Sequence, residues 1–206
     1  MEKKTEVIII AGMPASGKST VAKKLGTEFG YPILEKDDLK EALFDTVGFE
    51  CYAEKRRLDL AAAAVLLRAA DAMLKAGTSL IIVNNFRTDM EEAVQNMLDS
   101  NQCICVTVFF TGNADIFYKR YVERDLAHAR HLGHIVQDHY PPHPGDCTDY
   151  AMTREEFAEK FEKLGMADFR INGKRIEVDA TNPEQIDVSG LIDEIKKAFW
   201  EMKQTD

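Results

Sequence analysis

The sequence predicts one α/β domain, in which helices cover both faces of a five-stranded parallel sheet. Three observations support this prediction. Short apolar segments alternate with segments whose apolar residues recur every three or four positions, as strands alternate with helices in this class. The 206 residues are 45% apolar and 30% charged, which suits a single domain near the upper end of the common range of about 100 to 200 residues. No repeat, low-complexity tract or linker divides residues 1–206.

Five segments have the short, apolar character of strands inside a parallel sheet. These strands are predicted at residues 6–11, 31–34, 79–84, 103–110 and 175–179. Helices are predicted between and after them, at residues 18–29, 38–45, 58–75, 89–98, 114 to about 129, 154–164 and 191–202. The clearest is 58–75, where Leu58, Ala62, Val65 and Ala69 recur at helical spacing and Gly77 follows the end.

The composition argues against several classes of protein. The net charge of −9 disfavours an extended nucleic-acid-binding surface. The longest apolar run, residues 60–67, is far shorter than the roughly 20 residues of a membrane-spanning helix. The lysines and apolar stretch at the start are interrupted by Glu2 and Glu6 and lead directly into a loop motif, so we do not interpret them as a signal peptide. Four cysteines are too few for a disulfide framework. We therefore expect a soluble, cytoplasmic protein with no membrane partner.

A phosphate-binding loop follows the first predicted strand. The segment Gly12-Met-Pro-Ala-Ser-Gly-Lys-Ser19 matches G-x-x-x-x-G-K-[ST] and precedes a predicted helix, as this motif requires. Its glycines let backbone N–H groups point at phosphate oxygens, and the helix N-terminus favours the same anion. Lys18 should reach the β- and γ-phosphates, and the Ser19 hydroxyl should bind Mg²⁺. The candidate nucleotide-binding residues here are Gly12, Pro14, Ala15, Ser16, Gly17, Lys18, Ser19 and Thr20.

The remaining acidic residues help to choose among nucleotide-binding proteins. No N-K-x-D motif for guanine is present, and the third strand ends in Asn84-Asn85 rather than in an acidic pair. The second strand instead runs into Glu35, Asp37 and Asp38. A carboxylate there could orient and deprotonate a hydroxyl in phosphoryl transfer, and we assign that role to Asp37. Glu35 is a weaker candidate Mg²⁺ ligand. The alternative is that Asp37 or Asp38 only caps a helix.

These motifs together resemble one group of P-loop kinases. The group includes bacteriophage-type 5′-hydroxyl polynucleotide kinase, with chloramphenicol phosphotransferase, shikimate kinase and the zeta-type toxins as more distant relatives. The similarity rests on the phosphate loop, on Glu35-Lys-Asp-Asp-Leu-Lys40, on Arg124 and on Arg130-His-x-Gly-His134, and it spans most of the chain. It implies a three-layer α/β/α P-loop NTPase fold with a lid, ATP as phosphate donor, and Asp37 as the base. It does not imply a particular acceptor.

The lid is predicted at about residues 120–149, a basic and then proline-rich segment. Arg120 and Arg124 share a helix face, and the resemblance implies that these arginines, with Arg130, close over ATP and stabilise γ-phosphate charge. Pairing within the helix is the alternative. The same resemblance places the loop containing Thr181 beside adenine.

All five histidines lie at 128–143. Lid contacts are favoured for them over a metal site, because their spacing matches no zinc pattern.

The acceptor should bind where the parallel strands end. Lys40, Asn85 and Arg87 are the candidate substrate-binding residues, beside a wall that contains Phe44, Phe49, Tyr52, Arg56 and Phe86. We therefore predict a Mg²⁺-requiring kinase that moves the γ-phosphate of ATP to a hydroxyl of a small molecule. One alternative is a 5′-hydroxyl polynucleotide or nucleoside kinase. A second, of another class, is an ATP-dependent switch that transfers nothing. The acceptor and the oligomeric state do not follow from the sequence.

Overall fold

The computed structural model describes residues 4–144, 146 and 152–204, and in these ranges five strands form one sheet. All strand pairs are parallel, in the order β2-β3-β1-β4-β5. The strands are β1 (Glu6–Gly12), β2 (Ile33–Glu35), β3 (Leu80–Val83), β4 (Ile104–Thr111) and β5 (Lys174–Asp179). The predicted α/β class and five-stranded parallel sheet are confirmed, with strand ends shifted by one or two residues.

β1 is the central strand, and every one of its residues is buried. Ile9 lies opposite Ile82 of β3 on one side and Thr107 of β4 on the other. A strand covered on both faces must be apolar at consecutive positions, which explains the run Val7-Ile-Ile-Ile-Ala11. The loop that follows β1 therefore starts from the most constrained backbone of the domain.

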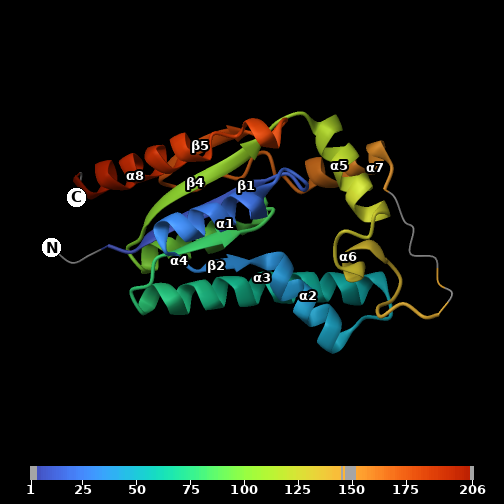
Figure 1. Ribbon diagram of the computed structural model, residues 1–206. Coiled ribbons are helices and arrows are strands. Elements are labelled where there is room, and N and C mark those ends of the chain that lie inside the picture. The colour runs from blue at the N-terminus through green and yellow to red at the C-terminus, as the bar shows by residue number, and fades with distance from the viewer. Residues whose placement is uncertain (1–3, 145, 147–151, 205–206) are drawn as a thin grey trace.

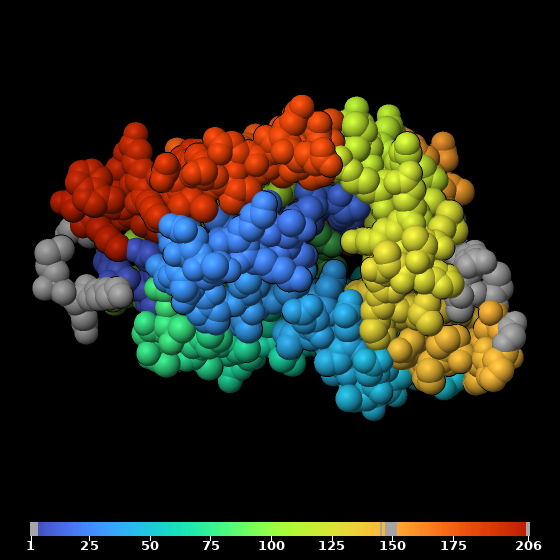
Figure 2. All heavy atoms as spheres, viewed as in Figure 1, coloured from blue at the N-terminus to red at the C-terminus, as the bar shows by residue number. Residues whose placement is uncertain are grey.

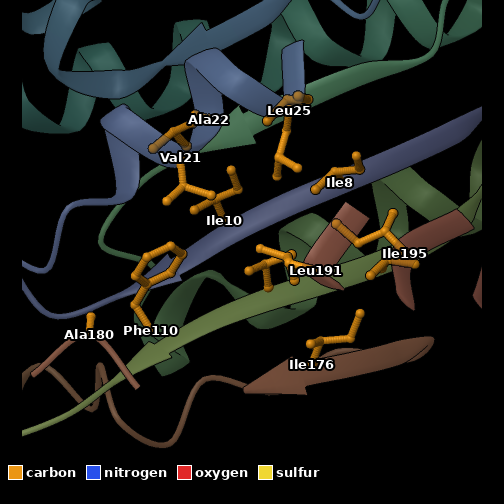
Figure 3. Packing of buried hydrophobic residues seen from close by; sticks show 14 of the residues in the cluster. Ile8, Ile10, Val21, Ala22, Leu25, Phe110, Ile176, Ala180, Leu191 and Ile195 are labelled. Atoms are coloured by element: carbon orange, nitrogen blue, oxygen red, sulfur yellow. The ribbon is translucent and has the colours of Figure 1, made fainter. Parts of the chain in front are cut away.

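Alternate residues of the strands point into two separate cores. On one face, Ile8 and Ile10 pack with Leu25 of α1 and Ile195 of α8, as Figure 3 shows. On the other face, Val7, Ile9 and Ala11 pack against α3 and α4. This alternation follows from the period of two along a strand, and it produces the three-layer α/β/α arrangement.

The described helices agree with most of the predicted ones. The helices of four or more residues are α1 (Lys18–Phe29), α2 (Lys36–Val47), α3 (Tyr52–Lys75), α4 (Glu91–Ser100), α5 (Ala114–Leu126), α6 (Leu132–Ile135), α7 (Arg154–Lys163) and α8 (Val188–Gln204). Two short 3₁₀ turns, Thr88–Met90 and Pro183–Gln185, complete the described elements. The short α6 was not predicted, and α3 begins six residues before the predicted start. None of the described helices is long and apolar enough to cross a membrane.

Three helices gather beyond the end of the sheet where the phosphate loop lies. Figure 1 shows α5, α6 and α7 at that end, with α6 beside α2. Tyr121 of α5 and Phe157 of α7 meet edge to face, with ring centroids 5.3 Å apart. The predicted lid range, about 120–149, covers part of α5 and all of α6, whereas α7 belongs to the same assembly but lies after that range. Positions 145 and 147–149 of the predicted lid lie outside the described residues.

The packing predicts how strongly α8 depends on its buried face. Ile195 is completely buried, whereas Trp200 on the same helix is 64% exposed. Ile195→Ala should lower the free energy of unfolding by about 2 to 5 kcal/mol, because it removes apolar contacts and leaves a cavity. Chemical denaturation measures this, with Trp200→Ala as the matched variant on the same helix. Equal losses in the two variants would contradict the packing described here.

Candidate functional site

The loop between β1 and α1 turns sharply through backbone conformations that suit glycine. Gly12 has φ 127° and Gly17 has φ 89°, and Ala15 also has a positive φ of 60°. A Cβ on Gly12 would lie 2.4 Å from the Phe110 carbonyl oxygen of β4, so no larger residue fits there. The predicted candidates of this loop, Gly12 and Pro14 to Thr20, thus form one compact turn at the N-terminus of α1.

Lys18 is folded back onto its own loop. Its Nζ donates to the carbonyl oxygens of Gly12 (3.1 Å) and Met13 (2.6 Å) and lies 3.4 Å from the Ser16 hydroxyl. Burial lowers the pKa of Lys18 to about 7, against the opposing influence of the Asp37 and Glu35 carboxylates. The ammonium group therefore lacks a full counter-charge in this state, and a triphosphate would supply one.

Ser19 and Glu35 come together from two different elements. The Ser19 hydroxyl, on the first turn of α1, donates to the Glu35 carboxylate at the end of β2. Burial raises the pKa of Glu35, with a further contribution from Asp38 and Asp37. A hydroxyl and a carboxylate beside a phosphate loop are the hard oxygen donors that Mg²⁺ takes. The predicted pair of metal ligands is thus brought together, and its chemistry fits that ion.

Asp37 lies on the first turn of α2, two residues after Glu35. Burial alone would raise its pKa, but the charges of His134, Lys36, Lys40 and Lys18 outweigh burial and lower it. Its carboxylate is therefore ionised at neutral pH. Among residues 4–144, 146 and 152–204, no side chain donates a hydrogen bond to it. An ionised carboxylate without a donor is suited to receive a hydroxyl.

These groups share one cavity of about 310 Å³. Figure 2 shows the surface hollowed where the blue region of α1 and α2 meets the yellow-green α5. The walls come from the phosphate loop, the start of α2, one side of α3, the end of β3, and α5 to α7. The predicted residues that line it are Pro14, Ala15, Ser16, Gly17, Lys18, Ser19, Thr20, Glu35, Asp37, Lys40, Tyr52, Arg56, Asn85, Arg87, Arg124 and Arg130.

Arg124 and Arg130 face this cavity from the lid side. The Arg130 guanidinium pairs with Asp125 (Nε to Oδ1, 2.6 Å) and donates to the Tyr121 hydroxyl at 3.0 Å. Arg124 differs, because it has no ion pair with an acidic side chain among the described residues, whereas the Nε atoms of both arginines are buried without a hydrogen bond. A buried guanidinium group without a counter-charge is costly, which makes Arg124 the better placed of the two to bind an anion.

Arg120 and Thr181 lie together but outside the cavity lining. Arg120 donates to the carbonyl oxygens of Ala180 (2.9 Å) and Thr181 (2.6 Å), and so joins α5 to the loop after β5. The Thr181 hydroxyl accepts from the backbone N–H of Asn113. Arg120 therefore holds the loop that was predicted to lie beside adenine, and its guanidinium group is hydrogen-bonded to that loop.

The predicted acceptor residues have other contacts as well. Arg87 forms a two-pronged ion pair with Asp89, with both N–O distances at 2.9 Å. Lys40 pairs with Asp59 at 2.9 Å. Asn84 is buried, and its amide nitrogen lies 3.5 Å from the Met90 sulfur. Phe44, Phe49 and Phe86 were expected on the acceptor wall, but all three are buried in hydrophobic clusters and do not line the cavity.

Sequence reasoning missed several cavity residues on α3 and α7. Lys55, Asp59 and Lys160 line the cavity, and none was predicted to do so. A signal was present on α3, because Tyr52, Lys55, Arg56 and Asp59 recur at positions i, i+3, i+4 and i+7. That spacing marks a polar stripe on one helix face. For Lys160 no comparable signal exists, since it lies on a helix rich in charged residues.

The histidines of α6 attach the lid to α2. His131 Nε2 lies 2.9 Å from Asp45 Oδ1, and His134 Nε2 lies 3.0 Å from Glu41 Oε1. Gly133 sits between them, where a Cβ would come within 2.3 Å of the Phe44 ring. The predicted lid contacts thus have a clear structural basis.

A second histidine group lies farther along the lid, at His139, His143 and Asp146. Potential ligand atoms of these three residues lie within 4.8 Å of one another. His139 Nε2 is already hydrogen-bonded to Asp146 at 2.7 Å, and the two imidazole rings stack. This arrangement is accounted for by pairing among the three side chains.

The pKa of Lys18 predicts how nucleotide affinity depends on pH. A bound triphosphate should return that pKa toward its ordinary value, so binding above pH 7 takes up a proton and the affinity falls as pH rises. Calorimetry at pH 8 in buffers of different ionisation enthalpy should detect uptake of about one proton per ATP. Burial also lowers the pKa of Lys55 to about 7, so Lys55→Gln is the control and should retain the uptake. No uptake, or its loss in Lys55→Gln, would contradict the assignment.

The packing of Gly133 predicts a localised defect. Gly133→Ala should destabilise the protein by about 1 to 3 kcal/mol, because the added methyl group overlaps the Phe44 ring. Combining it with Phe44→Leu should recover part of the loss, as a double-mutant cycle on the free energy of unfolding would show. Strictly additive losses would mean that the two positions do not touch.

Both the sequence and the fold are similar to those of known proteins. The model of the AAA domain family matches residues 7–137. The structure of a proposed kinase from Chloroflexus aurantiacus is similar over 95% of this chain and 99% of its own, with 27% identity and a TM-score of 0.79. Among curated proteins none matches the sequence.

Two more distant structures share the fold. A gluconokinase from Sinorhizobium meliloti matches at 16% identity over the whole of both chains, with a TM-score of 0.57. A shikimate kinase from Aquifex aeolicus matches at 17% identity over 94% of this chain and 95% of its own, with a TM-score of 0.50. The predicted P-loop NTPase fold is confirmed, and structures of kinases share it, whereas the polynucleotide-kinase group in particular finds no support. Since the family model covers well over half of its residues, the chain belongs to the AAA domain family.

Proposed function

We propose that this protein is an ATP-dependent kinase that transfers the γ-phosphate of ATP to a hydroxyl of a small molecule. One observation carries the proposal. The ionised Asp37 carboxylate has no side-chain donor among the described residues and lines the same cavity as Lys18 and Arg124. A base and two unpaired cations in one cavity are the groups that phosphoryl transfer to a hydroxyl requires.

Each residue then has a defined role in the proposed reaction. Asp37 accepts a hydrogen bond from the acceptor hydroxyl and takes its proton as the new P–O bond forms. Because its pKa is lowered, Asp37 is a weak base, and its main contribution is to orient the hydroxyl for in-line attack. Lys18 and Arg124 offset negative charge on the migrating phosphoryl group and on the departing ADP.

Ser19 and Glu35 would hold the magnesium ion that this reaction class uses. The ion supplies positive charge to the phosphate oxygens when it is bound. Glu35 is the N-cap residue of α2 and lies two positions before Asp37, so the start of this helix positions both carboxylates. Arg120 keeps the loop of Thr181 in place at the end of β5 and would thereby shape the adenine side of the site.

Enclosure of the cavity supports a small acceptor over a polymer. The walls include α2 and α3 on one side and α5 to α7 on the other, and α6 is fastened to α2 by both of its histidines. The structural relatives whose names state an acceptor class are a gluconokinase, a sugar kinase and a shikimate kinase. These names support a small hydroxylated compound, which we propose for this chain too.

An acceptor screen with ATP and Mg²⁺ tests the proposal. The panel comprises sugars, sugar acids, aminoglycosides, nucleosides and 5′-hydroxyl oligonucleotides, with phosphorylated product as the readout. Asp37→Asn should lower turnover of the best acceptor by about 10²- to 10⁴-fold, because it removes the base, and should leave ATP binding intact. Asp38→Asn is the matched control, since Asp38 is exposed and does not line the cavity.

Two outcomes would contradict the proposal in different ways. Slow ATP hydrolysis that Asp37→Asn leaves unchanged, with no phosphorylated product, would favour a nucleotide-dependent switch. Product on oligonucleotides alone would favour an enzyme that acts on nucleic-acid ends. Lys18→Ala does not distinguish these cases, because it weakens nucleotide binding in all of them.

A further inference from the structure

The cavity concentrates positive charge in an acidic protein. The whole chain has 35 acidic and 26 basic side chains. Among the described residues that line the cavity, however, nine are lysine or arginine and three are aspartate or glutamate. Like charges gathered in a partly enclosed space repel one another and lower the stability of the fold. Such an arrangement is retained where an anionic ligand offsets the repulsion.

Four of these nine cations already pair with an acidic side chain. Lys36 and Lys40 share Asp59, at 2.7 Å and 2.9 Å, and these ion pairs hold the pKa of Asp59 well below its usual range although burial alone would raise it. Arg87 and Arg130 pair with Asp89 and Asp125, as described above.

Three further cations of the cavity have other roles. Lys18 and Arg124 are the two assigned to the phosphates. Lys55 is buried on α3, and its Nζ donates to the carbonyl oxygens of Val136 and, at 3.0 Å, of His134, so it fastens the lid. Its ammonium group is committed to those backbone oxygens.

Arg56 and Lys160 remain, and neither has an acidic partner among the described residues. They lie on different helices, Arg56 on α3 and Lys160 on α7, and both line the cavity. Loss of hydration lowers the pKa of Lys160, and the nearby positive charges of Lys40, Arg130 and Arg56 lower it further, with Asp59 opposing. Two cations without acidic partners among the described residues thus line one cavity from two different helices.

We propose that Arg56 and Lys160 bind an anionic group of the acceptor, a carboxylate or a phosphate monoester, while its hydroxyl meets Asp37. This inference rests on the proposed function and names the class of its substrate. Lys40 and Asp59, which form an ion pair, line the same cavity as Asp37, Arg56 and Lys160. The acceptor is therefore a compact molecule that has a hydroxyl at one end and a negative charge at the other.

Anion binding is tested first without turnover. The full chain is saturated with Mg²⁺ and the non-hydrolysable analogue AMP-PNP, so that the phosphate loop is filled. Inorganic phosphate and malonate are then titrated against sodium chloride of equal ionic strength, and the thermal midpoint is recorded. Phosphate or malonate should raise the midpoint beyond the chloride control, and which of them acts more strongly distinguishes a phosphate from a carboxylate as the natural group.

Variants test whether the anion-dependent shift of the thermal midpoint depends on Arg56 and Lys160. Arg56→Gln with Lys160→Gln should abolish the anion-dependent shift and keep the shift caused by AMP-PNP. Lys163→Gln is the matched control, because Lys163 lies on α7, pairs with Glu159 and does not line the cavity. The proposal is overturned if phosphate and malonate act no more strongly than chloride, or if the double variant responds as the unmodified chain does.

Turnover provides the second test, with pairs of acceptors in which one member has an anionic group and the other has a neutral hydroxyl-bearing group in its place. Gluconate is compared with sorbitol, and a 3′-mononucleotide with its nucleoside. The charged member should be favoured, and Lys160→Gln should raise its KM by about 10- to 100-fold, the worth of one hydrogen bond to a charged group, with the KM for ATP unchanged. Equal use of charged and neutral members overturns this inference alone. Absence of any Asp37-dependent product contradicts the proposed function, whereas the anion titration still decides the inference.

Discussion

Burial of β1 on both faces fixes the starting point of the phosphate loop and hence the positions of the residues that follow it. A strand at the centre of a parallel sheet has little freedom to shift, because its residues pair with β3 and β4 and its apolar side chains, from Val7 to Ala11, pack into the two cores. The loop after β1 must therefore turn within the space left by Phe110 of β4, and Gly12 makes that turn possible. Lys18 and Ser19 derive their positions from this turn.

α2 is the second organising element, because it starts without an intervening loop at the end of β2. Glu35 closes the strand and Asp37 follows within the first helical turn. Farther along, Glu41 and Asp45 hold His134 and His131 of α6. The carboxylates near the phosphate loop and the anchor of the lid thus belong to one rigid helix.

Much of the fold follows from local patterns in the sequence. The strands were predictable because buried parallel strands are continuous apolar runs, and the phosphate loop has a spacing that its geometry requires. The start of α3 was predicted too late, at residue 58 instead of Tyr52, because the first two turns of the helix face the cavity and not a core. Apolar periodicity reports only helix faces that pack against apolar neighbours.

The site was predictable only in part. Asp37, Arg124 and Arg130 do line the cavity, but Arg120 is bonded to the loop of Thr181 and Phe44 is buried beneath α6. Those outcomes depend on contacts between segments that are distant in sequence, such as the 60 positions separating Arg120 from Ala180. Neither periodicity nor motif spacing contains that information.

Because α2 follows β2 without a loop, it connects the carboxylates beside the phosphate loop to the contacts that hold the lid. A displacement of α2 moves Glu35 and Asp37 at one end and the histidine anchors of α6 at the other, because the helix is continuous between them. Any ligand that favours one position of this helix alters the affinity of every other ligand that contacts it, and thermodynamics requires the effect to be mutual. A ligand that shifted this helix of twelve residues would therefore act on the carboxylates and on the lid contacts together.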